Sequence, residues 1–392
     1  MRRTTRAIVA ALVFCGLGCA SKEKTGMKIY VQQGLYDKAI AQGAQALVQN
    51  ENDGDTHYFM GAAYFGKDKD ALPEAPGYAD SSAAWLSRAY MHFTKAKQLA
   101  EVSWGASADD NIVSMYGLHF NRGLIAVRSN NFDLATTEFK LATIADPENF
   151  QGYYQHAMAV LEQANVAHKL EKKDEFMALT DVVLKDLDRV LELDPKDKET
   201  TLTVHQARGE VLYRRGDFAG AQEAYKKALA LSPENHQLYM TVADRFYNAK
   251  DWENAAKYYL DGLSVKQRLN IIDEKDAPNY SALGSALSQL GRRPEAIAAY
   301  EKVLTLKADD PTTLYNLMVT YYKSGDEAEK GGDMPTAKQF FSKAIGLGDK
   351  LIGLDAKKSE YWQVRGLCKR GVGDFAGAAR DLKEYQDLKG GR

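Results

Sequence analysis

Cysteine is scarce in this chain, and neither sign of charge is in excess. Three cysteines occur in 392 residues, and Cys15 and Cys19 lie near the N-terminus, so that Cys368 is alone in the rest of the sequence. A fold held together by intramolecular disulfides is therefore excluded, and Cys368 is interpreted as a small buried apolar residue. The 51 Lys and Arg and the 53 Asp and Glu are interspersed. This pattern argues against nucleic-acid binding and against an acidic disordered tail.

Motifs for catalysis or metal binding are also missing. The sequence has no nucleophile elbow, no phosphate-cradling glycine loop and no carboxylate pair at a defined spacing. His57, His119 and His205 each precede a glycine by four residues, and none has a second ligand three or four positions later. Their shared spacing favours a packing role. We therefore expect no metal, no cofactor and no enzymatic activity.

One pattern of small and aromatic residues recurs about every 34 residues along the chain. Its clearest copy is Gly209, Gly216-Asp217-Phe218, Ala221, Tyr225, Ala228 and Pro233. Other copies are Gly123, Phe132, Ala135, Phe139, Ala142 and Pro147, then Ala243, Trp252, Ala255 and Tyr259, and then Gly284, Gly291, Ala296 and Tyr300. The pattern resembles the tetratricopeptide repeat, a unit of two helices, A and B, joined by a turn.

The resemblance implies an all-α fold, a right-handed α-solenoid of about nine helix–turn–helix repeats that covers residues 27–392 as one domain. Small residues allow helices A and B to approach closely, and an aromatic residue of helix B fills the space toward the next unit. The glycines before each helix B are expected to end helix A in the left-handed conformation; they are Gly34, Gly216, Gly291, Gly332 and Gly373.

Insertions interrupt this period near residues 66–80, 164–176, 266–276 and 325–331. The first, second and fourth are placed in the turns between helices A and B, along one edge of the stack. The sequence leaves open whether these additions are partner loops or extended helices.

The N-terminal residues have the pattern typical of an export signal. Three arginines within the first six residues precede an apolar run over residues 7–17, which is too short to span a membrane. Gly18-Cys19 resembles a bacterial lipoprotein signal, which implies a signal peptide over 1–18, lipidation of Cys19 and a tether over 19–26. Cleavage after Ala20 without lipidation is the alternative. In lipoproteins of this type Ala20 implies the periplasmic face of the outer membrane, and a periplasmic or secreted protein is the alternative location.

In the repeat family, helix A lines a concave groove in which peptides or partner helices bind. Outward-facing positions of the predicted A helices are aromatic or apolar in the N-terminal and middle parts of the chain and polar toward the C-terminus. The candidate partner-binding residues are Tyr58, Phe65, Phe120, Leu124, Tyr154, Met158, Tyr213, Arg214, Met240 and Tyr247. Packing between adjacent units is the competing explanation for these side chains.

The resemblance therefore implies a non-catalytic scaffold or adaptor, lipid-anchored in the membrane, that binds protein partners of the cell envelope as an accessory factor in envelope assembly. Two alternatives stay open. One is a soluble periplasmic or secreted solenoid that binds a small ligand or a polysaccharide. The other is a regulator that recruits an envelope hydrolase.

Overall fold

The computed structural model describes residues 24–193 and 195–390. The expected signal peptide, Cys19 and most of the tether lie outside the described residues. Within them the chain forms seventeen α-helices, α2 to α18, and one 3-10 helix, η1, without a β-strand. Residues 24–32 are helical as well. The all-α fold class is confirmed, and no helix among the described residues is long and apolar enough to cross a membrane.

The chain divides into two compact units, one ending at Ala224 and the other beginning at Tyr225. Unit 1 contains α2 (Tyr36–Gln49), α3 (Gly54–Lys69), α4 (Tyr78–Leu99), α5 (Glu101–Arg128), α6 (Phe132–Ala145), α7 (Phe150–Lys169), α8 (Lys173–Glu192) and α9 (Lys198–Arg215). The division falls within α10 (Phe218–Leu231). Unit 2 contains α11 (His236–Asn248), α12 (Trp252–Arg268), η1 (Glu274–Asp276), α13 (Ala277–Gln289), α14 (Arg293–Leu306), α15 (Pro311–Lys330), α16 (Met334–Leu354), α17 (Ser359–Val372) and α18 (Phe375–Lys389).

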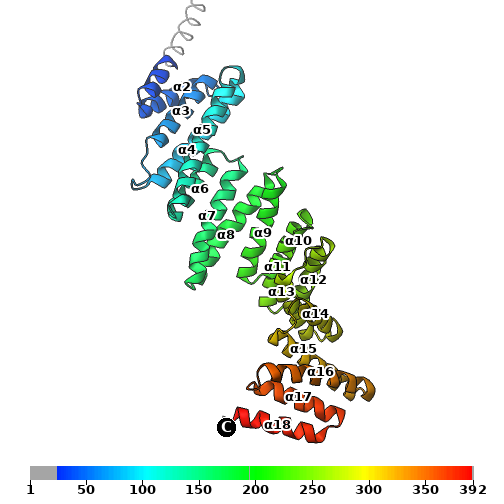
Figure 1. Ribbon diagram of the computed structural model, residues 1–392. Helices are drawn as coiled ribbons and strands as arrows, with labels where there is room; N and C mark the ends of the chain where they lie inside the picture. Colours follow the sequence, from blue (N-terminus) through cyan, green and yellow to red (C-terminus); the bar gives the residue numbers. More distant parts are fainter. Residues whose placement is uncertain (1–23, 194, 391–392) are drawn as a thin grey trace, which may run out of the picture. The chain divides into compact units, whose positions relative to one another are not determined.

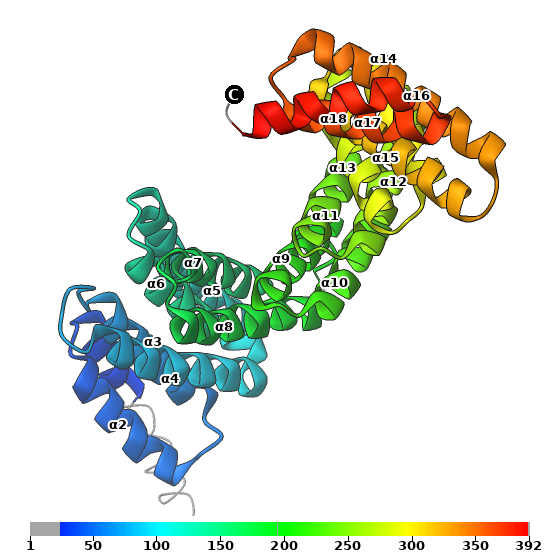
Figure 2. The ribbon, with the colours of Figure 1, turned by 90° about the horizontal axis from the view of Figure 1, so that it is seen from below.

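Consecutive helices pair into hairpins, as Figure 1 and Figure 2 show for α3 with α4 and for α7 with α8. Seven such pairs pack together in the part of the chain that the structure describes: α3–α4, α5–α6, α7–α8, α11–α12, α13–α14, α15–α16 and α17–α18. With the helix over residues 24–32 before α2, and with α9 before α10, the order of the helices agrees with the nine repeats expected. The odd-numbered helices α3 to α17 are the A helices and their even-numbered successors are the B helices. The extension of one continuous solenoid over residues 27–392 stays a prediction.

Within a pair, a glycine of helix A lies beneath an aromatic ring of helix B. A Cβ atom added to Gly123 would lie 2.6 Å from the ring of Phe139, and one added to Gly284 would lie 2.7 Å from the ring of Tyr300. These distances are shorter than any carbon–carbon contact, so only hydrogen fits there. The alanines on either side of the ring are buried, as Ala135 is beside Phe139. The predicted alternation of small and aromatic residues is confirmed by this packing.

Eight of the turns between helices A and B have a left-handed residue within two positions of the end of helix A, whereas in the turn between α3 and α4 the left-handed residue, Gly77, directly precedes helix B. Gly34, Gly216, Gly291, Gly332 and Gly373, all expected in this conformation, have φ angles from 71° to 94°. Three other turns carry a non-glycine residue instead, with φ angles between 56° and 60°, which the sequence did not reveal: Asn130, Glu171 and Lys250. In each repeat from the third onward this residue follows the small residue of helix A by seven positions.

Two of the predicted insertions are extended helices. In the stretch 164–176, α7 continues to Lys169 and α8 begins at Lys173, and in 325–331, α15 continues to Lys330. The A helices α7 and α15 have 20 residues each, against 13 in the A helices α11 and α13. Their turns have the ordinary length, so the expectation that these turns are lengthened is wrong. The other two stretches do include a loop, over residues 70–77 and 269–273.

Extra length enters a helix without disturbing its buried face because seven residues are almost two turns at 3.6 residues per turn. The apolar positions of the added segment therefore stay on the side that packs against the neighbouring helix. Helices α8 and α16 are lengthened beside α7 and α15, to 20 and 21 residues. The added helical turns lie at the ends of these helices that face the linkers between repeats. The sequence had predicted the opposite edge, where helices A and B of one repeat are joined.

A buried polar network joins three helices in unit 1. His119 on α5 has no exposed surface, and its Nε2 and Nδ1 donate to Asp68 at 2.9 Å and Glu138 at 2.7 Å. An imidazole donates from both nitrogens only when it is protonated. Burial lowers the pKa of His119, but the hydrogen bonds and charges of the two carboxylates outweigh it, and the net pKa is raised. Tyr78 also donates to Glu138, at 2.8 Å.

A pair of histidines, His57 on α3 and His92 on α4, is also buried in unit 1. The Nδ1 atoms of His57 and His92 lie 2.8 Å apart, and His57 Nε2 lies 2.9 Å from the carbonyl of Glu51. Because a carbonyl only accepts, His57 donates from Nε2 to Glu51. Burial, with the charges of His57 and Arg88, lowers the pKa of His92 to about 4. Like His119, these histidines have structural partners.

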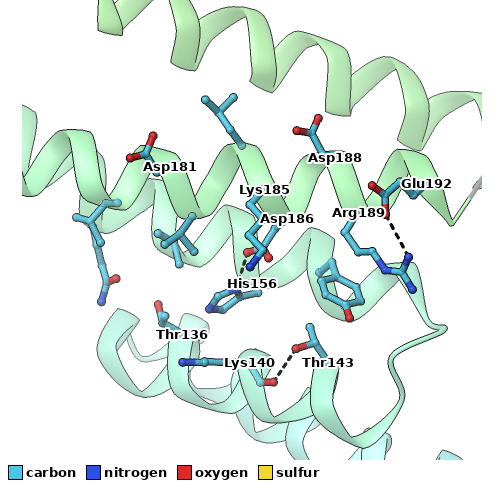
Figure 3. A pocket seen from close by; sticks show the side chains of 16 residues that line it. Thr136, Lys140, Thr143, His156, Asp181, Lys185, Asp186, Asp188, Arg189 and Glu192 are labelled. Atoms are coloured by element: carbon cyan, nitrogen blue, oxygen red, sulfur yellow. Dashed lines mark hydrogen bonds and ion pairs between the residues drawn. The ribbon is translucent and has the colours of Figure 1, made fainter.

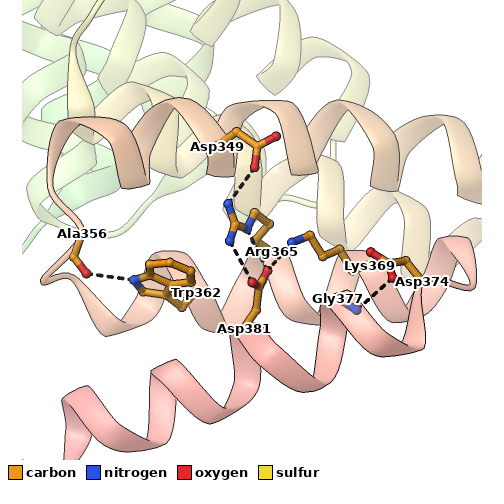
Figure 4. A network of polar contacts seen from close by, with 8 residues as sticks. All are labelled: Asp349, Ala356, Trp362, Arg365, Lys369, Asp374, Gly377 and Asp381. Carbon is orange, nitrogen blue, oxygen red and sulfur yellow. Dashed lines mark hydrogen bonds and ion pairs between the residues drawn. The ribbon is translucent and has the colours of Figure 1, made fainter. Parts of the chain in front are cut away.

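In unit 2 the last two repeats are joined by an arginine, drawn in Figure 4. Arg365 on α17 donates to both carboxylate oxygens of Asp381 on α18, at 2.7 and 2.8 Å, and to Asp349 on α16 at 2.7 Å. Lys369 lies 3.0 Å from the same Asp381, which is 3% exposed. Although burial opposes it, these hydrogen bonds and charges lower the pKa of Asp381. One guanidinium thus connects three consecutive helices.

Candidate binding site on the A helices

Eight of the ten predicted binding residues lie on four A helices of unit 1. They are Tyr58 and Phe65 on α3, Phe120 and Leu124 on α5, Tyr154 and Met158 on α7, and Tyr213 and Arg214 on α9. All eight side chains are half-buried. Each therefore supports the core with one side and leaves the rest of its surface accessible. We call this set the A-face residues.

Tyr58 is held by the N-terminal part of α5. Its ring stacks on Trp104 with centroids 4.0 Å apart and planes inclined by 15°. Trp104 Nε1 donates to Asp55 at 2.6 Å, and Asn111 donates to the Tyr58 hydroxyl at 3.3 Å. The half-buried Trp104 belongs with Tyr58 at the site, and the sequence did not identify it. It lies outside the repeat pattern, so only the fold brings it to α3.

The middle of the A face is built on aromatic packing. Phe120 stacks on Tyr116 with ring centroids 5.1 Å apart and meets Phe139 edge-on at 5.7 Å. Phe65 packs against the hydrophobic core of the first three repeats, and Leu124 against the cluster around Phe139. These residues have the packing role that was the competing explanation, and their outer surfaces stay available for a ligand.

The A face continues over α7 and α9. Tyr154 and Met158 pack on the core of valines and leucines between α7 and α8, and burial raises the pKa of the Tyr154 hydroxyl. Arg214 donates to Glu210 at 2.6 Å and to Asn165 on α7 at 2.5 Å, so it joins neighbouring A helices. Tyr213 lies with its ring centroid 5.7 Å from Phe218. The guanidinium of Arg214 is therefore engaged in contacts within the protein that stabilise α7 and α9.

Met240 and Tyr247, the other two predicted residues, lie on α11 in unit 2. Met240 is 6% exposed, and its methyl carbon lies where a side chain at Gly262 of α12 would be. Because its side chain fills the space inside its own hairpin, Met240 is not available to a partner, and that assignment is wrong. Tyr247 is half-buried and donates to the Ser285 hydroxyl at 3.0 Å.

A small polar cavity lies further along the A helices of unit 2. Its volume is about 180 Å³. It is lined by residues of α13 and α15 with two side chains of α14, including Ser285, Ser288, Asn316, Thr320 and Lys323. The polar character expected for this part of the A helices is present, with hydroxyl and amide groups that exchange hydrogen bonds among themselves or with a ligand.

Neither a metal centre nor a reactive thiol was found among the described residues. No group of three or more His, Cys, Asp and Glu in that part of the chain could hold a metal ion. Cys368 on α17 is fully buried, and burial raises the pKa of its thiol to about 12. A thiol in that state is a poor nucleophile and a poor metal ligand at neutral pH.

Two family models match the hairpins described above. The model described as tetratricopeptide repeat matches residues 203–235, which cover most of α9 and all of α10. The model described as TPR repeat matches residues 272–325, from η1 into α15. The chain contains tetratricopeptide (TPR) repeats.

Relatives of this TPR protein share modest identity. It is 22% identical to "TPR repeat-containing protein MJ1428" of Methanocaldococcus jannaschii, over 90% of this chain and 67% of the relative. It is 23% identical to "DnaJ homolog subfamily C member 3" of Rattus norvegicus over 53% of this chain, but spans only 39% of that relative's length. Among solved structures, the crystal structure of MamA protein is 22% identical, with a TM-score of 0.37, over 48% of this chain and 92% of that one.

Proposed function

We propose that this TPR protein is a non-catalytic scaffold that binds segments of partner proteins on the A face of unit 1. The observation that carries the proposal is the row of half-exposed aromatic and apolar side chains on α3, α5, α7 and α9. Protein-binding sites draw most of their energy from a few such anchors. TPR proteins act as protein-interaction scaffolds, which supports this role.

The anchors are held rigidly by the core beneath them. Tyr58 is fixed by stacking on Trp104, and Phe120 by stacking on Tyr116. A ligand therefore does not have to immobilise these rings, and binding loses less conformational entropy. A segment with apolar side chains repeated along its length, either extended or helical, fits a row of anchors on successive helices.

The test replaces Phe120, Tyr154 and Met158 together with Gln and compares partner capture by crosslinking and pull-down from the native envelope. A control variant replaces Met91, a 53% exposed residue of B helix α4, with Gln. We expect the triple variant to lose its partners while the helix content measured by circular dichroism is kept. Unchanged capture by a folded triple variant would eliminate the A face as the binding site.

We further propose that the protein is exported, lipidated at Cys19 and held at the periplasmic face of the outer membrane, where it serves envelope assembly. The support is Gly18-Cys19 after a short apolar run, and Ala20 after the cysteine. Mass spectrometry of the mature N-terminus and membrane fractionation of a Cys19→Ser variant test it. We expect a lipidated Cys19 and release of the variant from the membrane, whereas an unmodified N-terminal Ser21 would refute lipidation.

A further inference from the structure

A groove separate from the A face opens between two B helices of unit 1. It has a volume of about 980 Å³, its walls are α6 and α8, and α7 contributes its base (Figure 3). None of the A-face residues lines it. Both B helices pack against α7, and the space between them is left open.

The base of this groove carries a fixed histidine. His156 Nδ1 donates to Asp186 Oδ2 at 2.6 Å, and the two side chains are only 8% and 12% exposed. The hydrogen bond to the carboxylate sets the orientation of the imidazole ring. In Figure 3 the ring of His156 lies between the two walls, with Lys140 on one side and Lys185 on the other.

The charges of the groove are unevenly compensated. Three of its four acidic residues have an arginine partner: Asp181 pairs with Arg215 at 2.6 Å, Asp188 with Arg208, and Glu192 with Arg189 at 3.1 Å, whereas Asp186 accepts the hydrogen bond from His156. Lys140 of α6 and Lys185 of α8 are exposed and make no ion pair or side-chain hydrogen bond within residues 24–193 and 195–390. When the outside partners Arg208 and Arg215 are counted, five Lys and Arg side chains face four carboxylates, so the net charge of the groove with its ion pairs is positive.

The shape of the groove suits a chain better than a compact ion. Its α8 wall runs from Leu179 to Glu192, which is about 20 Å at the rise of an α-helix. Between the charged residues the same wall has apolar surface, including Val182, which is 39% exposed. A ligand that fills the length of the groove therefore needs apolar groups as well as negative charge.

We propose that this groove binds an acidic segment of a partner protein. Carboxylates of the segment pair with Lys140 and Lys185 on the two walls, and an apolar side chain between them covers Val182. The pairing needs no rearrangement of existing salt bridges, because both lysines are free to take a partner. This site does not depend on the A face, so either surface can fail its test while the other stands.

The experiment selects dodecapeptides from a random phage library on the wild-type protein. The pool is then depleted on the double variant Lys140→Glu/Lys185→Glu. The best peptide, labelled with a fluorophore, is titrated by fluorescence anisotropy against both proteins. The control is Lys302→Glu/Lys338→Glu, which reverses two exposed B-helix lysines of unit 2 that likewise make no ion pair among the described residues.

We expect the selected peptides to be rich in Asp and Glu with interspersed apolar residues. Reversal of Lys140 and Lys185 should weaken binding about tenfold or more, and the control should change it less than about twofold. Peptides without acidic residues, or equal loss in both double variants, would overturn the proposal. Displacement of the peptide by millimolar inorganic phosphate, or tighter binding to anionic lipid vesicles than to the peptide, would also overturn it.

Discussion

The close contact between each such glycine and the aromatic ring above it leads to a prediction about stability, which a Gly284→Ala variant would test. A helical Gly→Ala change stabilises by about 1 kcal/mol when nothing else is affected. At Gly284, however, the new Cβ would lie 2.7 Å from the ring of Tyr300, against a normal contact distance of about 3.5–4.0 Å. Overpacking of this kind costs about 1–3 kcal/mol. We therefore expect Gly284→Ala to be destabilised by up to about 2 kcal/mol after the helix-propensity gain.

The same substitution at Gly346 provides the matched control. Gly346 lies within α16, is exposed, and has no atom within 4 Å of the position of an added Cβ. Gly346→Ala should therefore stabilise by about 0.5–1 kcal/mol, opposite in sign to Gly284→Ala. Tyr300→Leu removes the ring, and in that background Gly284→Ala should cost less.

Urea unfolding followed by circular dichroism measures all four variants, and hydrogen exchange of α13 and α14 locates the effect. Hydrogen exchange is needed because repeat proteins can unfold in parts rather than all at once. Equal stabilisation by both Gly→Ala changes, or an unchanged cost of Gly284→Ala in the Tyr300→Leu background, would refute the close-packing argument.

Three further experiments test the buried polar and thiol groups. The pKa of His119 is raised in the folded protein, so its contribution to stability is full below the unfolded pKa of about 6.5 and is lost as the pH rises through the folded pKa. The urea midpoint of the wild type should therefore fall over this pH range, and that of His119→Gln should not. Arg365→Lys removes the two-pronged contact with Asp381 and should cost about 1–2 kcal/mol, whereas Arg268→Lys in an exposed pair should change the unfolding free energy by less than about 0.5 kcal/mol. In a protein of residues 24–392, a thiol reagent at pH 8 should label Cys368 only after denaturation, and labelling of the native protein would contradict its burial.

The sequence was sufficient for features that repeat within one hairpin. The left-handed glycines, such as Gly216 and Gly373, and the buried rings, such as Phe139 and Tyr300, follow from spacing alone, since each depends on neighbours in the same helix pair. Glu171 takes the same left-handed conformation, although glutamate does not favour it. The residue type therefore did not indicate a turn at Glu171, and only the ends of the helices on either side locate it.

Contacts between repeats were beyond the reach of the sequence. Trp104 stacks on Tyr58 of the preceding hairpin, and His119 connects Glu138 of its own hairpin with Asp68 of the preceding one. Periodicity reports which face of a helix is buried and does not report which polar groups meet there. The groove between α6 and α8 could not be predicted for the same reason, since nothing in the sequence distinguishes its lysines from other exposed lysines.

The two-turn additions to α7 and α8, and to α15 and α16, imply that the length of a hairpin and its rotational phase are independent properties of this protein. An added heptad lengthens a helix by about 10 Å and returns its side chains to almost the same angle around the axis. Long and short repeats can therefore alternate along one chain without separate interfaces for each length. Removing seven residues from α15 together with seven from α16 should give a shorter repeat that still fits its neighbours, so hairpin length can vary in evolution, or be engineered, one repeat at a time.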